Sequence, residues 1–249
     1  MQFRQAAVSA VGLALAAVLA TGCGRAAEAD SDEGSGPADN TATHAKTTEL
    51  AERLGADRTT IIVGSVDDTV AVQVYEDMRC PVCKEFEGAK SGAPALRELT
   101  QAGIFRTEYT LASFLDDGLG GAGSKRAANA LRAALEKKKF TQYHDVLFAH
   151  QPEESVDGYT DEFLLRMASL VPGLRGADFD SAVRTMEYRG FVTASEKAYE
   201  KAKTSGTPGF GVNGRLVPDT VRGAMFDPKL LATAVEYTAM PPSSRPKLS

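Results

Sequence analysis

The sequence Cys80-Pro-Val-Cys83 lies between two stretches of different periodicity, and this placement restricts the fold more than any other feature of the chain. Before it, Val70-Ala-Val-Gln-Val-Tyr75 has the β-branched and aromatic composition of a strand. After it, apolar residues recur at helical spacing from Phe86 to Leu99, with Pro94 marking a kink or a restart. The sequence therefore predicts a strand that passes directly into a helix, with Cys80 at the helix N-cap and Pro81 at the first helical position.

A cysteine at this position is expected to have a reactive sulfur. Free backbone N–H groups and the positive end of the helix dipole point at it, and both stabilise a thiolate. Arg79 and Lys84 flank the pair and are expected to act in the same direction. Together these effects lower a thiol pKa from ~8.5 into the range of ~3.5–7.5. Cys83 lies one turn further along, where its sulfur is less exposed yet near enough to attack a disulfide formed on Cys80.

Two other roles are open to such a pair. A structural disulfide between Cys80 and Cys83 would close a loop so short that it removes little chain entropy. A zinc site takes four ligands, usually from two such pairs or from one pair with histidines. The third cysteine of the chain, Cys23, lies in a targeting segment, so the folded part has no second pair. Redox chemistry is therefore favoured, and no metal site is predicted.

The remaining apolar patterns predict an α/β fold in three layers. Strands are expected over 60–63, 70–75 and 105–111, and a hairpin over 209–217 with its turn at Asn213-Gly214. Between 118 and 189 apolar residues recur at helical spacing, which indicates a helical insertion. A last helix is expected from Asp227 to about Tyr237, with Asp227 as its N-cap and Pro228 at its first position.

The N-terminus is typical of a secretory signal. Arg4 precedes an apolar run from Ala6 to Ala20, which at about 15 residues is too short to cross a hydrocarbon core of ~30 Å. The end of this segment, Leu19-Ala-Thr-Gly-Cys23, resembles a bacterial lipobox. That resemblance implies that Cys23 carries a lipid and becomes the new N-terminus, anchored by more than one acyl chain. The alternative is an ordinary signal peptide and a secreted product.

These patterns divide the chain into segments. Residues 1–22 are the predicted lipoprotein signal peptide, and 23–46 a lipidated, disordered tether with almost no large apolar residue. Residues 47–117 and 190–240 are predicted to form one α/β domain in two parts, separated by the helical insertion 118–189, and 241–249 a disordered tail. The formal net charge of -5 argues against a nucleic-acid-binding protein, which would carry a basic excess.

Three motifs, in this order, resemble the DsbA-like branch of the thioredoxin superfamily: Tyr75-Glu-Asp-Met-Arg-Cys-Pro-Val-Cys-Lys-Glu-Phe86, Lys139-Phe-Thr-Gln-Tyr-His-Asp-Val-Leu-Phe148 and Gly206-Thr-Pro-Gly-Phe-Gly-Val-Asn-Gly214. The likeness covers roughly Thr60 to Tyr237 and implies a thioredoxin-like fold with an inserted helical domain. It also implies that Pro208 follows a cis bond and faces the disulfide, so that the backbone of Thr207 pairs with an extended substrate segment. A redox-active disulfide is implied, with no dissociable cofactor.

The chain departs from the family's pattern at Val74. Related enzymes often have a buried acid there, six residues before the first cysteine, which helps to move a proton to or from the second. Glu76 and Asp77 are near, on opposite faces of the strand, and Asp77 matches an acid common in related sequences. A proton relay and a solvated carboxylate are both open for these two acids. His144 and His150 are interpreted as packing residues of the helical region.

The resemblance implies an extracytoplasmic thiol–disulfide oxidoreductase, held on the outer face of the cell membrane through Cys23. The predicted site has Cys80 and Cys83 as the reacting residues, supported by Pro81, Val82, Arg79, Asp77, Thr207 and Pro208. Reduced secreted proteins are the expected substrates, and a membrane partner that hands electrons to quinone is implied for reoxidation. A reductase or isomerase of the same fold is one alternative, and a non-catalytic lipoprotein binding module or chaperone is another.

Overall fold

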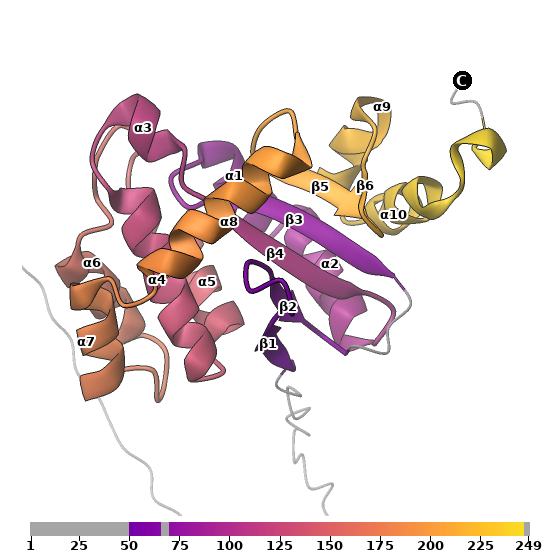
Figure 1. The fold of residues 1–249 in the computed structure, drawn as a ribbon. Coiled ribbons are helices and arrows are strands. Elements are labelled where there is room, and N and C mark those ends of the chain that lie inside the picture. Colours follow the sequence, from indigo (N-terminus) through magenta and orange to yellow (C-terminus); the bar gives the residue numbers. More distant parts are fainter. Residues whose placement is uncertain (1–49, 66–69, 247–249) are drawn as a thin grey trace, which may run out of the picture. The chain divides into compact units, whose positions relative to one another are not determined.

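The computed structural model describes residues 50–65 and 70–246, which are built around a six-stranded sheet of order β1-β2-β4-β3-β5-β6 (Figure 1). β3 and β4 run parallel, and the other neighbouring pairs are antiparallel. The strands are β1 (Glu52–Leu54), β2 (Ile61–Val63), β3 (Ala71–Asp77), β4 (Arg106–Ala112), β5 (Gly209–Val212) and β6 (Arg215–Leu216).

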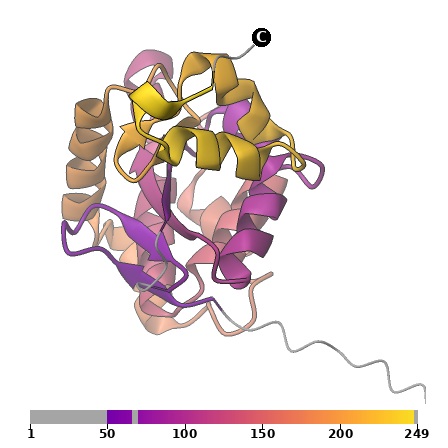
Figure 2. The ribbon, with the colours of Figure 1, turned by 90° about the vertical axis from the view of Figure 1, so that its right-hand side faces the viewer.

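Helices cover both faces of the sheet. α8 (Arg189–Ala202) lies along β4 on one face, and α2 (Gly92–Gln101) lies on the other, as the two views from perpendicular directions show (Figures 1 and 2). α10 (Leu231–Ala239) packs against α2 and β5. Because both faces are covered, the central strand β3 is mostly buried, as is usual for strands in the middle of such sheets. Its carboxyl end leads into α1 (Pro81–Glu87) and so delivers Cys80 to the edge of the core.

A group of helices is inserted between β4 and α8. These are α3 (Leu115–Leu119), α4 (Gly123–Glu136), α5 (Phe140–Ala149), α6 (Asp161–Ala168) and α7 (Ala177–Thr185). α4 is the central member, in contact with α5, α7 and α8. Its apolar stripe, which includes Ala127, Leu131 and Leu135, is buried, as the helical spacing predicts. The sequence therefore located the inserted helices by their periodicity.

The first strand, β1, is not predicted by the sequence. Three residues are too few to show a period, yet Glu52 is buried and has a structural role. Its carboxylate accepts hydrogen bonds from the backbone N–H groups of Phe140 (2.9 Å) and Thr141 (2.7 Å). Glu52 thereby pairs two of the unpaired donors at the start of α5, where a negative charge is also favoured by the helix dipole.

The C-terminal part agrees with prediction in its hairpin and differs in its last helix. Asn213 and Gly214 both have positive φ (50° and 76°), as a two-residue hairpin turn requires. The helix expected from Asp227 begins only at Leu231. The prediction is wrong because Asp227 accepts from the Lys229 backbone N–H (2.8 Å) and closes a separate turn instead of capping the helix.

Three short helices near the C-terminus are also absent from the prediction: α9 (Asp219–Arg222), η1 (Gly223–Phe226) and η2 (Pro242–Ser244). η2 lies in the stretch that the sequence assigns to a disordered tail, and Arg245 after it donates to the carbonyl oxygen of Thr238 (2.9 Å). The chain is therefore ordered further than its composition indicates.

The predicted signal peptide, the tether and Cys23 lie outside the described residues. Across 50–65 and 70–246, no helix has the length and apolar character needed to cross a membrane.

Candidate active site

Cys80 is the N-cap of α1, with Pro81 at the first helical position, as predicted. The structure has both cysteines as free thiols. The Cys80 thiol donates to the carbonyl oxygen of Thr207 (3.3 Å), which brings together two segments far apart in the sequence. Cys80 is 7% exposed and Cys83 is 0% exposed. The expectation of an exposed Cys80 is therefore wrong, because the Thr207 loop covers its sulfur, although Cys83 is the more buried of the two.

The pKa of Cys80 is lowered from 9.0 to about 6. The largest cause is a hydrogen bond from the Cys83 thiol; burial opposes it, and hydrogen bonds from the Thr207 side chain and from the backbone N–H groups of Cys83 and Val82 add to the lowering. The helix start thus stabilises the thiolate as expected. A thiolate fraction exists at neutral pH, and the thiolate is the nucleophilic form.

The pKa of Cys83 moves the other way, well above 9.0. Burial is the main cause, followed by the hydrogen bond to Cys80 and by the negative charge of Glu76. One cysteine of the reduced pair is therefore expected as a thiolate and the other as a thiol at neutral pH.

The Thr207-Pro208 bond is cis, as the resemblance implies. Arg222 donates to the carbonyl oxygen of Pro208 (2.7 Å) and so helps to hold this loop. A hollow of about 240 Å³ lies beside the loop, between Lys203–Ser205 and Val217–Arg222. The backbone of the Thr207-Pro208 loop is thus held by a hydrogen bond and borders an open hollow.

Arg79 does not act on Cys80 in the way that the sequence suggests. Its side chain is buried, forms an ion pair with Asp116 (3.0 Å), and is not among the main causes that lower the pKa of Cys80. It also donates to the carbonyl oxygens of Gly120 (2.8 Å) and Glu154 (2.9 Å). The expected electrostatic effect on the thiol is corrected to a structural one: Arg79 ties two loops of the inserted helices to the segment before Cys80. Lys84 is exposed.

Two further side chains of the helical region hold the same segment. Gln151 donates to the carbonyl oxygens of Met78 (2.8 Å) and Cys80 (2.9 Å). The hydroxyl of Tyr159 also donates to Met78 (3.0 Å). Sequence reasoning missed both residues, because no spacing rule connects a side chain to a backbone carbonyl 71 to 81 residues away. Pro81 and Val82, between the cysteines, are exposed and form the outer surface of the motif.

Asp77 is buried and fully bonded. Its carboxylate accepts from the Ser124 hydroxyl (2.6 Å) and from the backbone N–H groups of Arg79 (3.0 Å) and Leu115 (3.1 Å). Burial raises its pKa to about 6, against the lowering effect of these hydrogen bonds. A solvated carboxylate is thus excluded for Asp77, whose contacts join β3 to the inserted helices.

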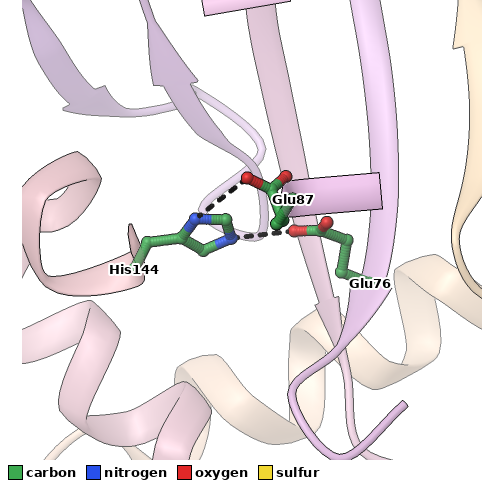
Figure 3. Close-up of side chains that lie close together, drawn as sticks. All are labelled: Glu76, Glu87 and His144. Atoms are coloured by element: carbon green, nitrogen blue, oxygen red, sulfur yellow. Dashed lines mark hydrogen bonds and ion pairs between the residues drawn. The ribbon is translucent and has the colours of Figure 1, made fainter. Parts of the chain in front are cut away.

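Glu76 is buried on the other face of β3 and contacts His144, the histidine that the sequence assigned to packing (Figure 3). The two ring nitrogens face different carboxyl groups: Nε2 lies 2.8 Å from Glu76 Oε2, and Nδ1 lies 4.0 Å from Glu87 Oε2. Burial lowers the pKa of His144, but the charge of Glu76 outweighs it, with a smaller contribution from the Glu87 carboxyl group, and the pKa is raised to about 10. His144 is therefore a charged group between two acids and more than a packing residue, whereas His150 is exposed and bonds to the carbonyl oxygen of Val146.

Glu76, Glu87 and His144 also have the composition of a cation site, since one ligand atom of each lies within 4.8 Å of the others. A cation would use one ring nitrogen together with both carboxylates, whereas here the carboxylates face opposite nitrogens. Arg97 already lies 3.5 Å from Glu87 and supplies positive charge. The geometry of these three residues is better suited to binding and exchanging protons than to coordinating a metal ion.

Comparison with known proteins shows which family the chain resembles. The family model described as thioredoxin matches residues 56–227. Over 161 residues the chain is 30% identical to the Na(+)/H(+) antiporter NhaA 3 of Salinispora tropica, a match that covers 61% of this chain and 21% of the antiporter. The chain thus spans about a fifth of the length of that curated relative.

Several solved structures have a similar fold. Oxidised DsbA of Mycobacterium tuberculosis is 21% identical with a TM-score of 0.56, covering 78% of this chain and 95% of its own. Oxidised BdbD of Bacillus subtilis is 18% identical with a TM-score of 0.61, covering 76% and 97%. MdbA of Corynebacterium diphtheriae, described as a thiol–disulfide oxidoreductase, is 21% identical with a TM-score of 0.57, covering 75% and 93%. The fold is thus the thioredoxin-like α/β fold with an inserted helical region, and the chain belongs to the thioredoxin family.

Proposed function

We propose that this protein is a thiol–disulfide oxidoreductase that oxidises cysteine pairs in secreted proteins through a mixed disulfide on Cys80. The observation that carries the proposal is the position of the Cys80 sulfur, at the start of α1 and 3.3 Å from the Thr207 carbonyl oxygen. A sulfur with a pKa of about 6 lies there against a backbone edge on which an extended chain could pair. The similar structures include proteins described as DsbA and as a thiol–disulfide oxidoreductase, which supports the same activity.

The proposed cycle begins with the Cys80–Cys83 disulfide. A substrate thiolate attacks the Cys80 sulfur, and Cys83 leaves. A second substrate thiol then attacks the mixed disulfide and releases Cys80 as a thiolate. Because the lowered pKa of Cys80 stabilises the reduced form, the pair is expected to be oxidising. Pro81, Val82, Thr207 and Pro208 border the reacting sulfur, while Arg79 and Asp77 fix the segment that carries it.

The cellular setting is part of the proposal. The N-terminal sequence supports export and lipid attachment at Cys23, which would hold the domain on the outer face of the membrane. There it would meet reduced proteins as they emerge, and a membrane partner that passes electrons to quinone would reoxidise the pair. Replacing Cys23 by Ala in the full chain should move the protein from the membrane fraction to the soluble fraction. Retention in the membrane would contradict lipid attachment.

The activity is tested by refolding of a reduced, disulfide-dependent protein with the wild type, Cys80→Ser and the surface control Lys84→Gln. Cys80→Ser should abolish the catalysis of disulfide formation, and the control should retain it. An equally active Cys80→Ser variant would instead indicate a binding module or chaperone. The reduction potential of the Cys80–Cys83 pair tests the direction of electron transfer. A value of about -120 mV, typical of a strong oxidant, supports the proposal, and a value of about -270 mV indicates a reductase.

A further inference from the structure

Cys83 must exchange a proton during the proposed cycle, yet its side chain is 0% exposed. When the disulfide opens, Cys83 leaves as a thiolate in a place where burial strongly favours the thiol. When the disulfide closes, the thiol must lose that proton before it can attack. The protein therefore needs an internal group that holds the proton beside Cys83.

Glu87 lies on the same face of α1 as Cys83, since residues four apart in a helix are neighbours. Its side chain is 2% exposed. Burial and the charge of Glu76 raise the pKa of Glu87 well above its usual value. Glu87 is therefore expected to carry a proton one helical turn from the Cys83 sulfur.

His144 of α5 connects Glu87 to Glu76 through its two ring nitrogens (Figure 3). Glu76 follows Val74 on the same face of β3, since the side chains of Val74 and Glu76 both point away from that of Tyr75. Thus the carboxylate absent at position 74 is supplied two residues later, on the same side of the sheet, and is held there by His144.

Side-chain oxygens without a hydrogen-bond partner gather at this place. Over the part of the chain that the structure describes, the buried ones are Glu76 Oε1, Glu87 Oε1 and Oε2, Thr141 Oγ1 and Asp145 Oδ1. They belong to the two acids that flank His144, to its neighbour Asp145, and to Thr141 one turn earlier in α5. A buried acceptor without a donor is costly, and protons on the carboxyl groups would supply the missing donors.

The charged and titratable groups around His144 come from several elements. They are Glu76 of β3, Glu87 of α1, Arg97 of α2, Tyr109 of β4 and Asp145 of α5. The charge of Glu76 also acts on Cys83 of α1. Arg97 is ion-paired with both Glu87 and Asp145, and the side chains of Arg97 and Asp145 are 26% and 37% exposed. The group therefore extends from the buried sulfur to the protein surface, which gives protons a way in and out.

We propose that His144 is a positioning residue of the redox site: through Glu76 and Glu87 it holds the proton that Cys83 takes up when the disulfide opens and returns when it closes. The proposal rests on the redox role of the pair. In the opening step the S–S bond breaks, a substrate thiolate bonds to Cys80, and Cys83 receives the pair of electrons and one proton from Glu87. Over the full turnover two substrate thiols lose two electrons and two protons, of which one proton ends on Cys83 and one in solvent.

The test compares two reactions of glutathione with the full chain, followed by acid quenching and mass analysis. The first is closure, in which Cys83 attacks a mixed disulfide between Cys80 and glutathione and must lose its proton. The second is exchange of glutathione at Cys80 in a Cys83→Ser background, which needs no proton transfer at position 83. His144→Gln should slow closure by about tenfold to a hundredfold, which is at or below the ~10²–10⁴-fold contribution of a complete general acid or base because His144 acts only through Glu76 and Glu87. It should leave exchange within about twofold.

His150→Gln is the matched control, an exposed histidine at the end of the same helix, and should change neither rate. Glu76→Gln, which keeps the side-chain shape, should slow closure in the same way and replaces His144→Gln if that variant does not fold. Unchanged closure, or equal slowing of both reactions, would overturn the proposal. So would stoichiometric Zn²⁺ binding that survives Cys80→Ser and is lost with His144→Gln, since the three residues would then form a metal site.

The two proposals fail separately. If Cys80→Ser still refolds proteins but His144→Gln slows closure, the substrate assignment is wrong and the role of His144 stands. If refolding depends on Cys80 but His144→Gln does not slow closure, the proposed function stands and the role of His144 is wrong.

Discussion

The pKa of Cys80 is lowered and that of Cys83 is raised. The reason is that Cys80 lies at the start of α1, whereas Cys83 lies within the helix and is buried in the core. At the first cysteine, unpaired backbone N–H groups and the second thiol stabilise a negative charge. At the second, the chain has entered the core, where burial and the charge of Glu76 disfavour it. The difference suits the roles in the proposed cycle, in which Cys80 is released from the mixed disulfide as a thiolate and Cys83 becomes a buried thiol.

Alkylation of the reduced protein by iodoacetamide as a function of pH should therefore show a midpoint near 6 for Cys80, compared with about 8.5 for a free thiol. Cys83 should react only after unfolding. Cys83→Ala removes the hydrogen bond that lowers the pKa most, so it should move the midpoint upward. A wild-type midpoint near 8.5, or one unaffected by Cys83→Ala, would show that the helix environment does not activate the sulfur.

At the scale of elements, the inserted helices are joined to the sheet domain by polar contacts around the segment 77–80. Arg79 reaches the loops that hold Gly120 and Glu154, and Asp77 bonds to Ser124 at the start of α4. The reacting cysteine therefore follows a segment that both parts of the fold hold in place.

Arg79→Met should destabilise the protein by about 3–5 kcal/mol, the usual effect of breaking a buried ion pair, because Asp116 and two loop carbonyls lose their donor. Denaturation by urea measures this change. The alkylation midpoint of Cys80 should stay within a few tenths of a pH unit, since the guanidinium group of Arg79 is held by Asp116 and two loop carbonyl oxygens. Lys84→Met, at an exposed position, should alter neither quantity. A large upward shift of the midpoint in Arg79→Met would restore the electrostatic role that the sequence suggested.

Sequence patterns correctly predicted the features of the fold that depend on interactions between residues close together in the chain. The strand before Cys80, the helix start at Pro81, the turn at Asn213-Gly214 and the periodic helices all depend on neighbours in the sequence, and the structure has each of them. The predicted helix start at Asp227 is wrong because the local pattern there is ambiguous: an aspartate followed by proline is as common in a turn as at a helix N-cap.

Contacts between distant polar side chains could not be predicted in this way. Glu52 caps a helix 88 residues away, Arg79 pairs with a residue 37 away, and His144 bonds to an acid 68 away. Each of these side chains would be at the surface in most proteins, so composition assigns them to solvent or to packing. Their burial becomes favourable only when the fold brings the partner to the same place.

For the molecule as a whole, the same thiolate links redox state to stability. The pKa of the Cys80 thiol is expected at about 8.5 in the unfolded chain, as for a free thiol, and is lowered to about 6 in the folded reduced chain. Between these values the folded form binds fewer protons than the unfolded form, so its stability rises with pH. Below pH 6 both forms are protonated and the contribution is lost. The oxidised form has no thiol at this position and lacks the effect.

The reduced protein is therefore expected to gain stability relative to the oxidised protein as the pH rises from about 6 to about 8. At higher pH, Cys83 ionises in the unfolded chain before it does in the folded chain, and this opposes the gain. Asp77, with its pKa of about 6, is present in both forms, and its contribution largely cancels when they are compared at each pH. The disulfide closes a very short loop and adds only an offset that does not depend on pH. Urea denaturation of both forms across this range, without oxygen, measures the difference. A gap that stays constant with pH would mean that the thiolate does not stabilise the folded state, and the reason for expecting an oxidising pair would be removed.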